Sequence, residues 1–428
     1  MVHSYSNIKF QATESGFKHH FNEDFSLFAI WKTARPFIDT IVDTLNERFE
    51  IVLQTEIIWS EKYFHENANR LYEAPLYYST LDKTDVSSYA DKIGGNSFIL
   101  IVIKDKNPNY TYSNSVSGKI ELTNLNIQES KNNLRKIIEL KTGEKYGVHS
   151  ANNIYEFFYQ GSLILGLDLF YEVLKGEKMT LPVLEKDLEG AGGWKDYKSF
   201  FSILNVGCNY IVLRSFENLI ELNKNEDKDI DFLTDNFQRL ASVGGIIQKR
   251  YQPYKGYVYI GGEKISIDIR FIGDNYYDPA WQKDIMNNKI FNNGLYSPSD
   301  SDYFFSLFYH AKVQKPTVKA KYYTILENLS LKLQFLWFNK SMLDDDISSA
   351  KLLKGFLEGS NYSYKDPLDK HVYENKIITK HLPQDNVYIL KGTPLQKTKD
   401  FLKRVLPRKI VDRIQEVRRN KREKITAN

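Results

Sequence analysis

The chain has 428 residues, of which 42% are hydrophobic, and a mean hydropathy of −0.45. This length accommodates two or three domains. No apolar run approaches the roughly 18 to 20 residues that a membrane span needs, and the first residues lack the pattern of a secretory signal. The single cysteine, Cys208, excludes an intrachain disulfide, and these features together predict a cytoplasmic protein.

The formal net charge of +4 is unevenly distributed along the chain. Residues 397–424 contain twelve Lys and Arg and four Asp and Glu, a charge of +8, so the remainder carries −4. A basic segment on a mildly acidic body indicates an anionic partner.

The N-terminal part predicts a small α+β domain. Residues 1–24 are polar, and we expect an irregular arm there. Residues 25–167 then alternate between strand and helix patterns, which predicts a ferredoxin-like α+β domain. The expected strands are 25–31, 50–59 and 97–103, and the expected helices are 36–49, 60–72, 128–140 and 153–167.

Residues 24–166 also resemble nucleoside diphosphate kinase. The shared features are the order of elements, the segment Phe28-Ala29-Ile30-Trp31-Lys32, the central strand, and residues 147–153. The resemblance implies that His149 is an alternative, phosphate-accepting nucleophile. The family's Lys-Pro-Asp is Lys32-Thr33-Ala34 here, and its Gly-Thr-Ile-Arg stretch is missing. The other interpretation is that His149 caps the N-terminus of the next helix.

A linker and a second domain are expected next. Residues 168–200 predict the linker, and the glycine-rich residues 188–194 predict its most flexible point. Residues 201–315 predict a mixed-sheet domain. Its expected elements are strands at 209–214 and 229–233, a short helix at 236–243, and a hairpin at 257–268 that turns on Gly261-Gly262.

Three aspartates in this second domain indicate a metal site. Asp229 and Asp231 flank Ile230, so in an extended strand both carboxylates project to the same face. The alternating run 264–271 can place Asp268 beside them on a neighbouring strand. Crowded carboxylates repel one another, and Mg²⁺ or Mn²⁺ relieves that repulsion. Carboxylate-held metal pairs commonly move phosphorus-centred groups.

This arrangement resembles the nucleotidyltransferase superfamily, which carries a small-residue turn, then Asp-x-Asp on one strand, then a third acid on the next. Val212-Leu213-Arg214-Ser215 stands where hydrophobic-Gly-Ser is usual, so Arg214 replaces the glycine. Residues 276–281 and 304–315 are similar to the LicD and fukutin-like branch. The resemblance implies a nucleotide or nucleotide-activated donor and a glycan or glycolipid acceptor.

Each candidate residue has an expected role in such a phosphorus-group transferase. Asp229 and Asp231 would hold the metal, and Asp268 would complete the site and accept a proton from the attacking hydroxyl. The expected substrate-binding residues are Arg214, Ser215, Arg270 and Lys315. Three alternatives stay open: a solvated acidic turn, a glycosyltransferase that uses Asp-x-Asp to hold its metal, and a non-catalytic nucleotide-binding scaffold.

The C-terminal part is expected to be helical. Residues 316–396 predict helices followed by loops, and residues 397–428 predict a basic amphipathic segment. Such a segment suits an anionic membrane surface, which would place the protein at the inner membrane face. It lacks interleaved aromatic residues for base stacking, so nucleic acid is not an expected partner. The alternative is a terminal helix that docks on its own domain.

Overall fold

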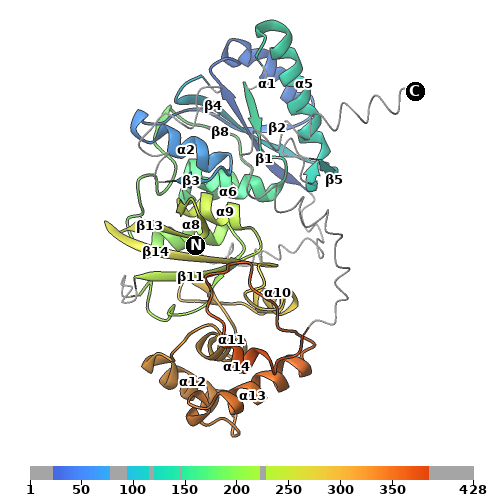
Figure 1. Cartoon of the computed structure of the whole chain (residues 1–428). Coiled ribbons are helices and arrows are strands. Elements are labelled where there is room, and N and C mark those ends of the chain that lie inside the picture. Colours follow the sequence, from blue (N-terminus) through green and yellow to red (C-terminus); the bar gives the residue numbers. More distant parts are fainter. Residues whose placement is uncertain (1–22, 78–93, 115–119, 145–146, 222–227, 385–428) are drawn as a thin grey trace, which may run out of the picture. The chain divides into compact units, whose positions relative to one another are not determined.

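The computed structural model describes residues 23–77, 94–114, 120–144, 147–221 and 228–384 (Figure 1). Residues up to Pro383 belong to one compact unit. Most of the expected polar arm and the basic segment 397–428 lie outside the described residues, so both stay predictions. None of the described helices combines the length and apolar character that a bilayer crossing requires.

The fold is of the α+β class, as the sequence predicts. A first sheet has the strand order β7-β1-β4-β2-β8, and β9 also pairs with β2. Its strands are β1 (Asp24–Trp31), β2 (Glu50–Ile58), β4 (Ser97–Asp105), β7 (Val148–Ser150), β8 (Met179–Thr180) and β9 (Leu184–Glu185). A separate hairpin is formed by β5 (Tyr110–Asn114) and β6 (Ile120–Asn124).

Helices cover both faces of this first sheet (Figure 1). They are η1 (Arg35–Phe37), α1 (Ile38–Asn46), η2 (Glu61–Tyr63), α2 (Phe64–Leu71), α5 (Leu125–Thr142), α6 (Ile154–Leu165) and α7 (Leu167–Val173). Alternation along β1 divides the core, because successive strand side chains point to opposite faces. Phe28 and Ile30 join a cluster with Ile41 of α1 and Leu134 of α5. The order β1-α1-β2-β4-α5-β7 is that of a ferredoxin-like unit.

A second sheet has the order β10-β11-β14-β13-β12-β3. Its strands are β3 (Leu76–Tyr77), β10 (Tyr210–Val212), β11 (Asp229–Thr234), β12 (Ile247–Lys249), β13 (Gln252–Ile260) and β14 (Glu263–Phe271). Gly261 and Gly262 make the β13–β14 turn with φ values of 59° and 80°, which confirms the expected hairpin. Helices α8 (Tyr197–Gly207) and α9 (Phe237–Gly244) lie between the two sheets (Figure 1).

The remaining elements follow β14 along the chain, and the helices α10 to α14 among them lie on the other side of the second sheet (Figure 1). They are α10 (Pro279–Asn287), the ribbon of β15 (Ile290–Asn292) and β16 (Leu295–Ser297), α11 (Asp300–Val313), α12 (Ala320–Lys332), η3 (Lys340–Leu343), α13 (Asp346–Gly359) and α14 (Lys376–Thr379). The helical character expected for this part of the chain is therefore present.

The expected flexible point at residues 188–194 is instead tied down at several positions. The indole nitrogen of Trp194 donates to the carbonyl of Gly244 at 2.8 Å. The backbone N–H of Trp194 donates to the backbone carbonyl of Tyr259, also at 2.8 Å. A Cβ on Gly190 would lie 2.3 Å from the Trp194 ring. The glycines thus permit close packing against a buried tryptophan. The expectation of flexibility was based on the number of glycines, and it is wrong for this segment.

Candidate functional site

Two of the three predicted aspartates lie directly beside each other. Strands β11 and β14 are parallel, and their register pairs Asp231 with Asp268. Ile230 and Ile267 are buried on the opposite face, so alternation directs both carboxylates away from the core. Their side chains are 21% and 27% exposed, respectively. Asp229 pairs in register with Ser266 and is exposed near the start of β11, so it lies outside this pair.

Each paired aspartate also contacts a buried arginine. Nη2 and Nε of Arg214 both donate to Oδ2 of Asp231, at 2.9 and 3.1 Å. Nη2 of Arg270 donates to Oδ2 of Asp268 at 2.9 Å, and its Nη1 donates to Oδ2 of Asp369 at 3.0 Å. The two arginine side chains are each 5% exposed. The sheet face therefore carries two carboxylate–guanidinium pairs side by side.

The surroundings of the pair shift the pKa values of several titratable groups, Asp268, Lys315 and Tyr276 among them. Burial raises the pKa of the Asp268 carboxyl, Arg270 opposes this, and the Asp231 carboxylate adds to the rise. Burial lowers the pKa of the Lys315 ammonium, and Arg214 lowers it further. Burial also raises the pKa of Tyr276 to about 12. The Tyr276 ring lies 4.4 Å from the Arg270 guanidinium, which is cation–π distance.

The residues present fit a divalent cation held by two carboxylates rather than three. Among the described residues, no cluster of three or more His, Cys, Asp or Glu has the geometry of a metal site. Oδ1 of Asp268, however, is buried without a hydrogen-bond partner. Mg²⁺ is commonly held by one or two carboxylates together with substrate phosphates. Asp231 and Asp268 supply that number of acids.

The predicted substrate-binding residues lie around the pair. Ser215 follows Arg214 and has a φ of 56°, in the left-handed region, and Lys321 Nζ donates to its Oγ at 3.1 Å. Lys315 follows the C-terminal end of α11 and interacts electrostatically with Asp231 and Asp268. The backbone of the turn after β10 is therefore in the left-handed conformation at Ser215, the position of the serine in the Gly-Ser turn of the resembled superfamily.

Sequence reasoning did not assign two charged residues near the pair. Lys255 of β13 lies directly opposite Asp268 in register, and its charge partly opposes the burial that raises the pKa of the Asp268 carboxyl. The alternation of Lys255, Tyr257 and Tyr259 was the signal that could have placed it on this face. No local sequence pattern could have predicted that Asp369 lies near the pair, because it contacts Arg270, which is 99 positions away in the chain.

His149 lies on β7, away from this face. Its Nε2 is 3.2 Å from Oε1 of Gln160, and its ring packs edge-on against Tyr72 at 4.7 Å. Burial lowers the pKa of His149 to about 3. The expected helix cap is instead Asn153, whose side chain accepts from the N–H of Glu156. The structure thus packs His149 against Gln160 and Tyr72 and gives the capping role to Asn153.

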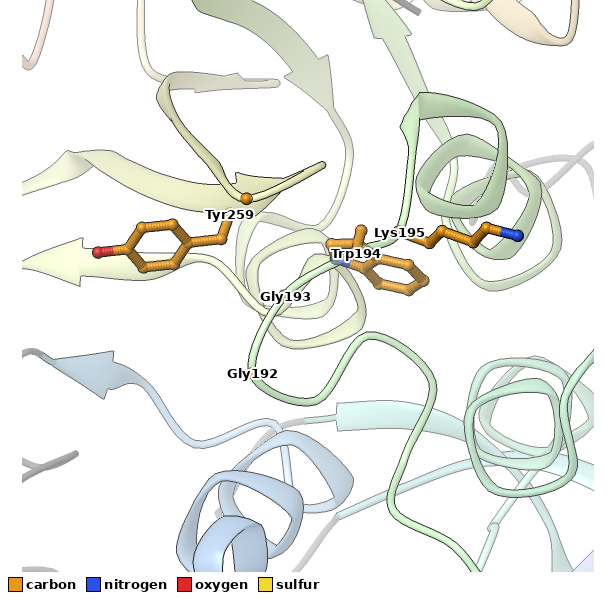
Figure 2. A pocket seen from close by; sticks show the side chains of 6 residues that line it. Gly192, Gly193, Trp194, Lys195 and Tyr259 are labelled. Atoms are coloured by element: carbon orange, nitrogen blue, oxygen red, sulfur yellow. The ribbon is translucent and has the colours of Figure 1, made fainter.

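A surface cavity of about 540 Å³ lies elsewhere, beside the β13–β14 turn (Figure 2). Residues 192–195, Tyr259 and Gly262 line it, and none of the candidate site residues does. The Tyr259 and Lys195 side chains extend away from each other in Figure 2. Backbone and glycine therefore form much of its wall, and it brings no set of reactive side chains together.

Comparisons with known proteins leave the family of this chain open. No model of a protein family matches it, and no match was found among curated proteins. Among solved structures, the nucleoside diphosphate kinase of Aquifex aeolicus is similar to part of this chain. The match covers 32% of this chain and 92% of the kinase chain, with 12% identity and a TM-score of 0.20. The sequence of residues 24–166 suggested the same class of protein, but a likeness this slight carries no argument about fold or activity.

Proposed function

We propose that the protein is a metal-dependent transferase that moves a nucleotidyl or phospho group onto a sugar or surface-glycan precursor. The observation that carries the proposal is the direct pairing of Asp231 with Asp268 on neighbouring strands of one sheet face. This is the strand context in which the resembled nucleotidyltransferases carry their acids. Lys255, Arg214 and Arg270 surround the pair with the positive charge that a phosphate donor requires.

The chain's own residues would perform binding and proton transfer. Arg214 and Arg270 present guanidinium groups that can hold phosphate oxygens, and Lys315 adds a further cation. The raised pKa of Asp268 suits a carboxylate that accepts a proton from an attacking hydroxyl. A Mg²⁺ or Mn²⁺ ion held by Asp231 and Asp268 would neutralise charge on the transferred group.

The proposed partners follow from this chemistry. They are a nucleotide or nucleotide-activated donor and a glycan or glycolipid acceptor. A cytoplasmic protein that rests on the inner membrane face through residues 397–428 would meet a glycolipid acceptor there.

One observation favours a second candidate, a non-catalytic nucleotide-binding scaffold. Arg214, at the position where the superfamily carries glycine, forms a two-pronged contact with Asp231. A guanidinium in this place offsets the carboxylate charge that would otherwise attract a cation.

Calorimetric titration with Mn²⁺ and a panel of nucleotides separates the two candidates. We expect metal-dependent nucleotide binding that is lost in Asp268→Asn and kept in Glu263→Gln, which alters an exposed acid at the start of the same strand. Nucleotide binding that needs no metal and survives in Asp268→Asn would favour the scaffold. Absence of both metal and nucleotide binding in the wild-type protein would reject the transferase.

A further inference from the structure

Among the described residues, each acid–arginine pair of the site leaves a buried polar atom without a hydrogen-bond partner. These atoms are Oδ1 of Asp268 and Nη1 of Arg214. The first is an acceptor and the second is a donor, and burying either of them unpaired costs free energy. A cation can satisfy only the acceptor and an anion can satisfy only the donor. The two atoms together therefore favour a ligand that brings both charges.

The ion pair between Arg214 and Asp231 competes with both kinds of ligand. Nη2 and Nε of Arg214 donate to the same oxygen, Oδ2 of Asp231. A cation at Asp231 weakens the contact of this carboxylate with the guanidinium, whose side chain is only 5% exposed. A buried charge that loses its partner is costly, so a cation that binds alone destabilises Arg214. An anion that binds Arg214 alone likewise leaves Asp231 without its cation.

The pair formed by Arg270 and Asp268 carries less of this cost. Arg270 also donates to Asp369, whose side chain is 6% exposed, at 3.0 Å. It therefore keeps one carboxylate when Asp268 turns to another ligand. Lys255 and Lys315 place further positive charge near the acids and oppose the approach of a bare cation. The first pair is thus the contact at which a cation and an anion depend on each other.

We propose that the site binds a divalent cation and a phosphate-type dianion cooperatively, and that the Arg214–Asp231 pair is the origin of this coupling. When both ligands are present, Asp231 exchanges the guanidinium for the cation and Arg214 exchanges the carboxylate for the anion. Neither charge is then left uncompensated. A free metal ion or a free anion on its own is a poor ligand. This inference rests on the proposed transferase site and adds how that site selects its ligands.

Mn²⁺ and inorganic sulfate test the coupling directly. Sulfate is a tetrahedral dianion like phosphate, and it binds Mn²⁺ only weakly in solution. Electron paramagnetic resonance of unbound Mn²⁺ measures metal binding to the full chain, with sodium chloride used to hold the ionic strength constant. We expect saturating sulfate to strengthen Mn²⁺ binding by about tenfold or more. Mn²⁺ should strengthen sulfate binding by the same factor, because coupling between two binding sites is reciprocal.

Substitution of Arg214 should produce a gain of metal binding. Arg214→Gln removes the guanidinium that competes for Asp231, so Mn²⁺ alone should bind about tenfold tighter than it binds to the wild-type protein. Sulfate should then add less than about threefold. Arg239→Gln is the matched control, because Arg239 of α9 forms a similar pair with Glu73 at 2.9 Å, in the layer between the two sheets. It should leave Mn²⁺ binding and its sulfate dependence unchanged.

The outcomes separate this inference from the proposed function. Equal Mn²⁺ affinity of the wild-type protein with and without sulfate would overturn the coupling and leave a metal site in place. Folded Arg214→Gln that binds Mn²⁺ no more tightly than the wild-type protein would also overturn it. Absence of Mn²⁺ binding in both proteins, even with sulfate, would reject the proposed function and the coupling together. Thermal unfolding shows whether the variant is folded, and the wild-type comparison decides alone if it is not.

Discussion

Arg214 and Arg270 differ in how many acids they contact, and this difference has consequences for stability. Among the described residues, the structure pairs Arg214 with Asp231 alone, whereas Arg270 contacts both Asp268 and Asp369. Removing one partner from a buried ion pair is costly because the other charge is left uncompensated. The two aspartates of the site should therefore respond differently to the same substitution.

We expect Asp231→Asn to lower the free energy of unfolding by about 3 kcal/mol, because it leaves the Arg214 charge buried without a carboxylate. Asp268→Asn should cost about 1 kcal/mol, since Arg270 keeps Asp369. Chemical denaturation of the two variants measures the difference. Equal losses, or a larger loss for Asp268→Asn, would contradict this arrangement of charges.

Asp24 makes stability depend on pH in an unusual direction. It lies opposite Asp105 across β1 and β4, and burial raises its pKa from 3.8 to about 6. The folded protein thus keeps this proton to higher pH than the unfolded chain does. Its contribution to the free energy of unfolding falls as the pH rises from about 4 to 6, by about 3 kcal/mol in total.

Asp24→Asn should remove this contribution, because the amide has no proton to lose and can still accept from the Tyr110 hydroxyl. Relative to the wild-type protein, the variant should gain stability between pH 4 and 7. Unfolding measured at several pH values gives this difference directly. A stability difference that does not change across this range would show that Asp24 has no raised pKa.

At the residue scale, the sequence predicts which face the acids occupy but not all of their partners. Alternation in Asp229–Asp231 and in residues 264–271 is a local pattern, and it correctly places Asp231 and Asp268 on one face. The contact between Arg214 and Asp231 depends on how β10 and β11 are aligned. The residue pattern within a single strand cannot predict how that strand aligns with its neighbour, so it cannot predict this contact.

At the scale of elements, the pairing of strands β12 and β13 requires their backbones to approach closely at Gly256. A Cβ added to Gly256 would lie 2.7 Å from the carbonyl oxygen of Ile247. This oxygen belongs to the neighbouring strand and cannot move without disturbing the pairing there. Gly262 is different, since its φ is +80° but no atom lies within 4 Å of an added Cβ.

We expect Gly256→Ala to destabilise the protein by about 2 kcal/mol or more, through overpacking against backbone. Gly262→Ala should cost about 1 kcal/mol, because only the left-handed backbone is strained. Thermal unfolding of the two variants compares these effects. A smaller loss for Gly256→Ala than for Gly262→Ala would contradict the close strand approach.

The elements that the sequence predicts are those with strong local patterns. The β13–β14 hairpin has a Gly-Gly turn between two alternating runs, and β1, β2 and β4 are rich in apolar residues. The short strand β3 was not predicted, because it pairs with β12 far along the chain. Two residues cannot form a recognisable strand pattern, so only the tertiary structure reveals this edge.

At the scale of the whole described unit, one continuous core joins the two sheets. Leu27 and Trp31 of the first sheet and Phe232 and Ile267 of the second belong to the same buried cluster. Arg70 of α2 has no exposed surface and donates to the carbonyls of Ser242, Val243 and Glu189. The linker expected between two domains instead contributes to this shared interior.

We therefore expect residues up to Pro383 to unfold in a single cooperative transition. Arg70→Met should lower the midpoint of that transition, with a loss of about 3 kcal/mol, because three carbonyls, two of them in buried contacts, lose their charged donor. Scanning calorimetry shows whether the variant keeps one transition. Two separate transitions in the wild-type protein would show that the sheets fold independently.

Asp231 and Asp268 together form the proposed reaction site. A crystal structure of the protein with Mn²⁺ and a nucleoside di- or triphosphate tests it most directly. We predict metal at Asp231 and Asp268, with ligand phosphates near Arg214, Arg270 and Lys315. Metal or nucleotide bound only elsewhere, such as the cavity beside Trp194, with both aspartates still held by their arginines, would contradict it.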